Sequence, residues 1–215
     1  MKSIQLGLKF GSRQFYRYSK RQLTPGFDGF AKKIISRDSN TCRMCGFKAL
    51  RYMNILNIDH NYTNNVAKNL VTACPLCLQC HFVEHIGPME NSGGTLIYMP
   101  EISQEKLNGL VHTLFCAIVN ATSQEQTAQN IYNSLRLRSK PVEKIYGEGR
   151  ADPKAFGEMV LNSTDDNKVK LEKNILKDIR VLAKLNSFSE QIKAWSEDAT
   201  NALETDLSVY GKSGS

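Results

Sequence analysis

NLVTACPLCLQCHFVEH, residues 69–85, places three cysteines and two histidines within seventeen positions. Cys74-Pro-Leu-Cys77 lies in this stretch, and a second pair of the same spacing, Cys42-Arg-Met-Cys45, precedes it in the chain. Each C-x-x-C pair turns two thiolates toward one ion, and two pairs complete a tetrahedral zinc site. We therefore predict one structural Zn2+ ion held by Cys42, Cys45, Cys74 and Cys77. Four sulfur ligands leave no position for a water, so this ion would stabilise the fold without catalysing a reaction.

A second register of the zinc site is open, because Cys77-Leu-Gln-Cys80 is an overlapping C-x-x-C pair followed by His81. In that register Cys77 and Cys80 replace Cys74 and Cys77 as ligands. In either register, His81 and His85 could be surface residues or hydrogen-bond donors beside the zinc. The sixth cysteine, Cys116, falls in an apolar helical pattern, and we expect it to be a small buried side chain.

Composition and charge indicate a folded, water-soluble chain with a basic front half. The chain has 215 residues, is 41% hydrophobic and carries a net charge of +7. It has no uninterrupted apolar run of about 18 residues and no secretory signal at its start, so we expect a cytoplasmic protein. Residues 1–55 contain twelve Lys and Arg against Asp28 and Asp38 alone, a local net charge of +10. Such a surface suits a nucleic acid, an acidic protein segment or a membrane surface.

The chain divides by pattern into a basic zinc-binding region (1–100), a helical region packed on it (101–208) and a disordered tail (209–215). In the first region we expect a short hairpin over residues 4–18 around Gly11-Ser12, and a helix over residues 27–37.

The second region is expected to be helical throughout. Ser103 is a candidate N-cap, Ser123 and Gln126 resemble a capping box, and Asp152-Pro153 resembles a helix start. A last helix is expected from Lys168 to Trp195, with Leu171, Ile175, Ile179 and Leu182 on one face. His112 lies beside the apolar stripe of its helix and is expected to be a packed or solvent-edge histidine and not a metal ligand.

The order of motifs resembles the HNH endonuclease, or ββα-metal, module: C-x-x-C, Asp59-His60, Asn69-Leu70, C-x-x-C. The resemblance implies an α+β fold in which zinc knuckles brace a hairpin and a helix. It places Asp59 at the position of a metal ligand, His60 at the general base and Asn69 at the orienting asparagine.

The resemblance breaks at the last position of the module. The final histidine should directly follow the last zinc cysteine, at residue 78, and this chain has Leu78. The second register recovers a histidine, His81, but puts Thr72 at the asparagine position. A leucine cannot ligate a metal, so we predict a noncatalytic protein in which Asp59, His60 and Asn69 are a remnant. A metal-dependent HNH nuclease and a noncatalytic nucleic-acid-binding module are the alternatives.

A wider stretch, RDSNTCRMCGF followed by NIDHNYTNNVAKNLVTACPLCLQCH, resembles the DotN, or IcmJ, family of the Dot/Icm type IVB secretion systems. This resemblance implies a zinc-bearing subunit of the coupling-protein complex, peripheral at the inner membrane through that complex. It further implies binding to the C-terminal extension of the coupling ATPase DotL, with DotM and the adaptor pair IcmS and IcmW in the same complex, and a role in effector export.

Overall fold

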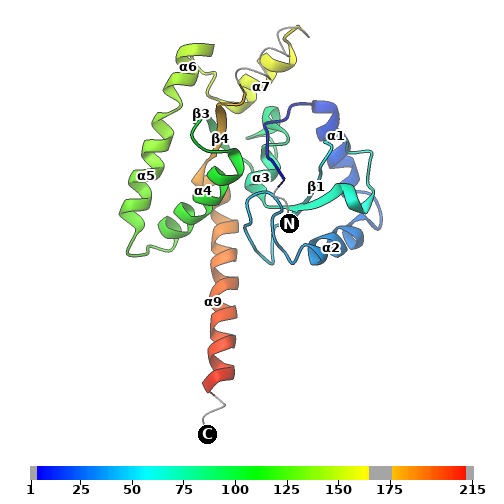
Figure 1. Ribbon diagram of the computed structural model, residues 1–215, viewed down its shortest axis with the longest axis vertical. Coiled ribbons are helices and arrows are strands. Elements are labelled where there is room, and N and C mark those ends of the chain that lie inside the picture. The colour runs from blue at the N-terminus through cyan, green and yellow to red at the C-terminus, as the bar shows by residue number, and fades with distance from the viewer. Residues whose placement is uncertain (1–3, 165–175, 212–215) are drawn as a thin grey trace.

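A computed structural model describes residues 4–164 and 176–211 of the chain, with side chains up to residue 200 (Figure 1). The described part contains helices and two small antiparallel sheets, which confirms the expected α+β class. The elements in chain order are α1 (Ser12–Gln22), α2 (Phe27–Arg37), β1 (Asn54–Asn57), η1 (Ala67–Asn69), β2 (Leu70–Ala73), α3 (Pro75–Gln79), η2 (Val83–His85), β3 (Gly94–Tyr98), α4 (Gln104–Val119), α5 (Glu125–Leu137), α6 (Lys140–Tyr146), α7 (Pro153–Leu161), β4 (Ile179–Ala183), η3 (Leu185–Phe188) and α9 (Ser189–Gly211).

The front of the molecule places two helices beside a short hairpin. Strands β1 and β2 pair antiparallel with Asn54 opposite Ala73, and α3 follows β2 directly. Helix α2 packs against both strands. The two cysteine pairs therefore flank the hairpin in sequence, one before β1 and one after β2.

The expected N-terminal hairpin is wrong, because residues 12–22 form helix α1 and the first strand begins only at Asn54. The carboxylate of Glu84 accepts hydrogen bonds from the backbone N–H of Gly11 (2.7 Å) and, more weakly, from the hydroxyl of Ser12 (3.5 Å). A negative charge at this position stabilises the start of a helix. Phe15 and Tyr18 then face inward onto Phe82, with ring centroids 5.3 and 5.1 Å apart. Glu84 and Phe82 are distant in sequence, but the helical spacing of Arg13, Tyr16, Arg17 and Lys20, opposite Phe15 and Tyr18, was a local signal that the hairpin prediction missed.

A buried arginine fixes α1 against the hairpin. The Arg21 side chain is 5% exposed, and its guanidinium donates to the side chain of Asn57 and to the carbonyl of Ile55. The same group lies over the rings of Tyr18 and Phe27. These contacts set which face of α1 points to solvent.

The second sheet joins the two sides of the expected boundary at residue 100. Strand β3 pairs antiparallel with β4, Gly94 opposite Ala183, although about 80 residues separate them in sequence. The side-chain amide of Gln104 then bonds both backbone groups of Val181 (2.8 and 2.9 Å), which covers the outer edge of β4. The division of the chain into two regions at residue 100 stays a prediction. Strand β3 belongs to the first of these regions and its partner β4 to the second.

The long helix expected over residues 168–195 is confirmed over residues 189–195 and wrong over residues 176–188. Leu171 and Ile175 lie outside the described residues, whereas Ile179 and Leu182 belong to β4 and the helix begins only at Ser189. Strand β4 is buried on both faces, so its apolar residues follow no period of two. The expectation that residues beyond 101 are all helical therefore fails at this strand.

The other expected helices and helix caps are partly confirmed. Helices α2, α4 and α7 occur where predicted, and Asp152 caps α7 by accepting from the backbone N–H of Ala155 (2.8 Å). Ser103 precedes α4 but makes no capping bond with its side chain. The capping box at Ser123 does not form, because α5 begins at Glu125 after a turn in which the Thr122 hydroxyl accepts from Gln124 (3.3 Å).

Cys116 is exposed, contrary to its expected burial. It lies five residues after the buried Val111, a rotation of about 140° that turns it away from the core.

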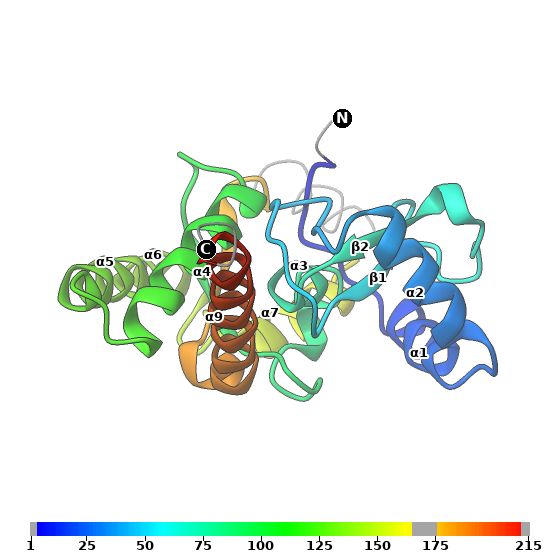
Figure 2. The ribbon, with the colours of Figure 1, turned by 90° about the horizontal axis from the view of Figure 1, so that it is seen from below.

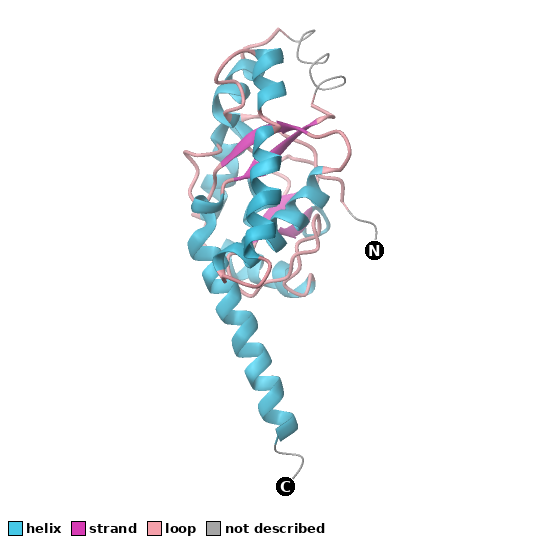
Figure 3. Cartoon of the chain, turned by 90° about the vertical axis from the view of Figure 1, so that its left-hand side faces the viewer, coloured by secondary structure: helices cyan, strands magenta, loops and turns pink. Residues whose placement is uncertain are grey.

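Helix α9 starts in the core and continues away from the rest of the chain (Figures 1 and 3). Ile192 and Ala194 are buried near its start, whereas the ribbon beyond residue 200 extends alone. The helix runs to Gly211, so it includes part of the tail expected at 209–215, and residues 212–215 lie outside the described part.

Gly157 gives a test of how closely α7 packs on η2. A Cβ atom at Gly157 would lie 2.7 Å from Cα and 2.9 Å from the backbone nitrogen of Glu84. The backbone cannot move aside cheaply, so we expect Gly157→Ala to lower the free energy of unfolding by about 2 kcal/mol in guanidinium titrations.

The matched control is Gly109→Ala in α4, where the nearest atom would be the Cys45 carbonyl oxygen at 3.7 Å. This variant should be neutral or more stable by up to about 1 kcal/mol, because alanine favours helix over glycine. Equal effects of the two substitutions would contradict the close packing of α7.

Candidate metal centre

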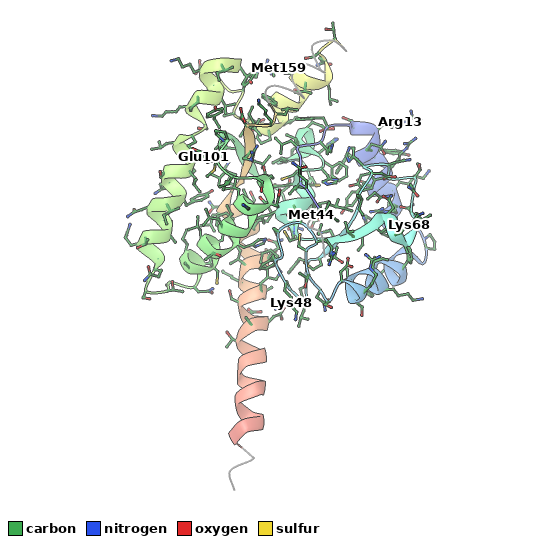
Figure 4. All side chains as sticks on the ribbon, in the orientation of Figure 1. Arg13, Met44, Lys48, Lys68, Glu101 and Met159 are labelled. Carbon is green, nitrogen blue, oxygen red and sulfur yellow. The ribbon has the colours of Figure 1, made fainter. Side chains whose placement is uncertain are left out.

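Four cysteine sulfurs meet at the junction of the two sequence pairs. The Sγ atoms of Cys42, Cys45, Cys74 and Cys77 all lie within 4.8 Å of one another. Three of these residues are at most 1% exposed and Cys45 is half-buried. Figure 4 shows Met44, inside the first pair, near the middle of the molecule. Among the described residues, these four cysteines are the group of three or more Cys, His, Asp or Glu side chains that lie close enough together to hold one metal ion.

Local backbone structure turns both pairs inward. In the first knuckle the backbone N–H of Cys42 donates to the carbonyl of Phe47 (2.8 Å), and Gly46 has a positive φ of 79° that closes the turn. In the second, Cys74 precedes α3 and Pro75 occupies the first turn of that helix. One turn of helix then places Cys77 on the same side as Cys74.

The four sulfurs differ in how readily they lose a proton when no cation is bound. Hydrogen bonds from Cys45, Cys74 and Cys77 lower the pKa of the Cys42 thiol well below its usual value. Burial raises the pKa values of Cys74 and Cys77 well above theirs. Four buried thiolates would repel one another, and a divalent cation at their centre removes that penalty. The donor set therefore fits Zn2+, which prefers four sulfurs in tetrahedral geometry.

Helix α4 places two side chains in hydrogen-bond contact with the sulfurs, and sequence reasoning missed both contacts. The side-chain amide of Asn108 lies 3.2 Å from Cys77 Sγ, and His112 Nε2 lies 3.3 Å from Cys74 Sγ. Burial lowers the pKa of His112 to about 4, which leaves a neutral ring with one N–H to donate. Asn108 and His112 are four residues apart and therefore lie on one face of α4, the face that carries the buried Val111; this spacing was the signal that the sequence offered. His112 is packed, one of its two expected positions, and it also contacts the four-cysteine cluster.

The same histidine connects the cluster to α9. The His112 ring stacks on Phe47 (centroids 3.7 Å apart), and Phe47 meets the edge of Trp195 (4.7 Å). Trp195 donates its indole N–H to the carbonyl of Arg51 (3.0 Å). The first knuckle is thus held between α4 and α9.

Cys80 lies outside the group of four. Its thiol donates to the carbonyl of Leu76 (3.3 Å), and burial raises its pKa to about 12. The backbone carbonyl of Cys80 accepts from Lys9, which holds the N-terminal segment. The cysteines brought together are those of the first register.

Asp59 and Asn69 lie together and stabilise a loop. The Asn69 amide donates to Asp59 Oδ1 (2.9 Å), and its Oδ1 accepts from the backbone N–H of Asp59 (3.2 Å). The remaining bonds of the Asp59 carboxylate go to Asn61 and to the amide of Asn64 (2.9 and 2.7 Å). Both carboxylate oxygens are therefore engaged within residues 59–69.

His60 and His81 lie on the other side of this loop, in an aromatic cluster. The two ring centroids are 5.5 Å apart, and His81 Nδ1 shares a hydrogen bond with the Tyr62 hydroxyl (3.2 Å). The ring nitrogens of His60 have no hydrogen-bond partner among the described residues, and burial lowers its pKa. Leu78, at the expected position of the final histidine, is 7% exposed and belongs to the core. His81 is buried, so of the two alternatives the surface position is wrong for it.

These features define a class: an α+β protein built around a buried four-cysteine cluster of the kind that holds a structural metal. The chain is 46% identical over 187 residues to a type 4 apparatus protein, DotN, of Legionella pneumophila subsp. pneumophila (strain Philadelphia 1). The aligned region covers 87% of this chain and 86% of that protein. The chain therefore belongs to the DotN family. No family model matches it, and no helix in the described ranges has both the length and the apolar character needed to cross a bilayer.

Metal analysis of single cysteine variants tests the register. We expect purified protein to contain one zinc per chain, and Cys77→Ser to lose it together with much of the stability of the front half. Cys80→Ser is the matched control, because its sulfur is equally buried but lies outside the group of four. Loss of zinc from Cys80→Ser with retention in Cys74→Ser would favour the second register instead.

The buried His81 predicts a loss of stability in mild acid. Burial, with the nearby charges of His60 and Lys9, lowers its pKa from 6.5 to about 3. Between these two pH values, His81 is therefore protonated in the unfolded chain and neutral in the folded protein. The stabilisation is complete above pH 6.5 and is lost as the pH falls toward the folded value.

Between pH 6.5 and about 5.5 this one group should cost about 1 kcal/mol of unfolding free energy. Guanidinium titrations of zinc-loaded protein measure it, with His81→Gln as the comparison. Thiolate protonation affects both proteins, so the difference in pH slope isolates His81. Identical slopes would show that His81 is not protected from protonation.

Proposed function

We propose that this chain is a noncatalytic, zinc-stabilised subunit of the coupling-protein complex of a type IVB secretion apparatus. The observation that carries the proposal is the 46% identity, over most of both chains, to a protein named as part of a type 4 apparatus. In this proposal the chain binds the C-terminal extension of the coupling ATPase DotL and supports effector delivery. DotM and the adaptors IcmS and IcmW belong to the same complex, which holds the chain at the cytoplasmic side of the inner membrane.

The proposed role of the zinc is structural. Four protein sulfurs would fill its coordination sphere, and Asn108 and His112 would donate to two of them. The ion would tie the knuckle before β1 to the one that leads into α3. A rigid front half of this kind suits a scaffold that holds a segment of a partner.

The strand–strand–helix order of β1, β2 and α3 supports an HNH-like origin of this module. The arrangement of Asp59, His60 and Asn69 supports the absence of nuclease activity. Asp59 uses both carboxylate oxygens within its own loop, and Leu78 offers no ligand. In the proposal Asp59, His60 and Asn69 have no catalytic role.

One observation favours the alternative of a metal-dependent HNH nuclease. Both ring nitrogens of His60 are buried without a hydrogen-bond partner among the described residues, and His60 lies in the basic half of the chain. Plasmid nicking with magnesium, manganese or nickel tests this alternative. Activity that His60→Ala abolishes would replace the noncatalytic proposal.

The main experiment is titration calorimetry of zinc-loaded protein with the purified C-terminal extension of DotL. We expect saturable binding and co-elution of the two in gel filtration. A scrambled extension of the same composition is the control, because it keeps net charge and length. Absence of both heat and co-elution, with zinc content and circular dichroism normal, would reject binding to this partner.

A further inference from the structure

The outward face of α1 combines cations with exposed apolar side chains. Arg13, Tyr16, Arg17 and Lys20 follow the i, i+3, i+4, i+7 spacing that places residues on one face of a helix. Leu23 directly follows the helix. Tyr16 is 64% exposed and Leu23 is 84% exposed, the highest value among the large hydrophobic residues whose burial is described. We call these five residues the α1 stripe.

The segment of the chain that carries the α1 stripe is strongly basic, and the acidic side chains beside it come from other segments: Glu84 is buried at the start of α1 and Glu90 lines the same hollow as Leu23. Residues 4–37 contain eight Lys and Arg and one acidic residue, Asp28, a local net charge of 8 − 1 = +7. Asp28 is already paired with Lys32 (2.7 Å). Within the part of the chain that the structure describes, the three cations of the stripe form no ion pair. Their charge is therefore available to a partner.

The orientation of α1 is fixed by its opposite face. Phe15 stacks on His85 (centroids 3.9 Å apart), and Arg21 is held by Asn57 and Ile55. The helix cannot roll to bury Tyr16 without breaking these contacts. Figure 2 shows α1 and α2 at one end of the molecule, opposite α5 and α6, and Figure 4 places Arg13 at the outer edge of this end.

We propose that the α1 stripe binds directly to an anionic lipid surface. Arg13, Arg17 and Lys20 would contact lipid phosphates, while Tyr16 and Leu23 would enter the headgroup region. A convex helix face suits a flat membrane, whereas an acidic peptide is held best in a groove. An exposed leucine gains little from a nucleic-acid backbone, so lipid is the partner that uses both components of the stripe.

This contact goes beyond the proposed function; lipid binding by the isolated chain does not depend on it, whereas its effect in the complex rests on it. A subunit held only through protein partners would need no lipid-binding stripe. Three cations and two apolar side chains give weak, reversible binding, which becomes effective once partners hold the chain near the bilayer. The stripe would then set which face of the chain lies toward the membrane.

Sedimentation with vesicles tests the proposal on the full-length, zinc-loaded protein. We expect binding to phosphatidylcholine vesicles that contain about 30% phosphatidylglycerol, and none to phosphatidylcholine alone. Reversal of three charges (Arg13→Glu, Arg17→Glu, Lys20→Glu) should lower the partition coefficient about 100-fold. Leu23→Ser should lower it about fivefold, and this loss should persist in high salt, because the apolar contribution is not screened.

The matched control reverses three exposed lysines on other helices: Lys106→Glu, Lys144→Glu and Lys193→Glu. It changes net charge by the same amount and should retain binding. Circular dichroism checks folding of each variant, and glutamine at the three stripe positions replaces glutamate if the reversed protein unfolds. Equal loss in both triple variants, or binding to neutral vesicles alike, would overturn the proposal. So would binding of labelled DNA or polyglutamate through the stripe with no vesicle binding.

Discussion

The gathering of four sulfurs is the constraint on which the front half depends. A hairpin of two four-residue strands is too small to be stable by itself. The knuckles on either side of it give those strands fixed ends, and α4 reaches the sulfurs with Asn108 and His112. The helices behind are therefore in contact with the cluster, so zinc binding and packing of α4 should be mutually stabilising.

The sequence allowed the cysteine cluster to be predicted better than the fold around it. C-x-x-C spacing is a local property, and the four expected cysteines lie together. Helices α4 and α7 were predictable for the same reason, since their apolar spacing and the Asp152 cap are local. Some errors were local, such as the expected burial of Cys116, and others occur where distant contacts help to decide the structure. Helix α1 depends on Glu84 and Phe82, and β4 depends on β3.

Asp59 and Asn69, which the HNH resemblance singles out, lie close together, but their hydrogen bonds are those of a closed loop. His60 is turned by its positive φ of 57° into an aromatic cluster with Tyr62 and Phe82. The sequence could predict that these residues are neighbours. The hydrogen bonds that make Asp59 part of a closed loop come from Asn61 and Asn64. No motif assigns a role to these two asparagines, so the sequence could not predict those bonds.

The pairing of β3 with β4 has a consequence for how the chain is made. The two strands enclose α4 to α7 in sequence, so the sheet closes a loop of about 80 residues and forms only after residue 183 has left the ribosome. Until then β3 has an open edge that can pair with another chain. Nascent or truncated forms that end before residue 179 should therefore need a chaperone or an early partner to stay in solution.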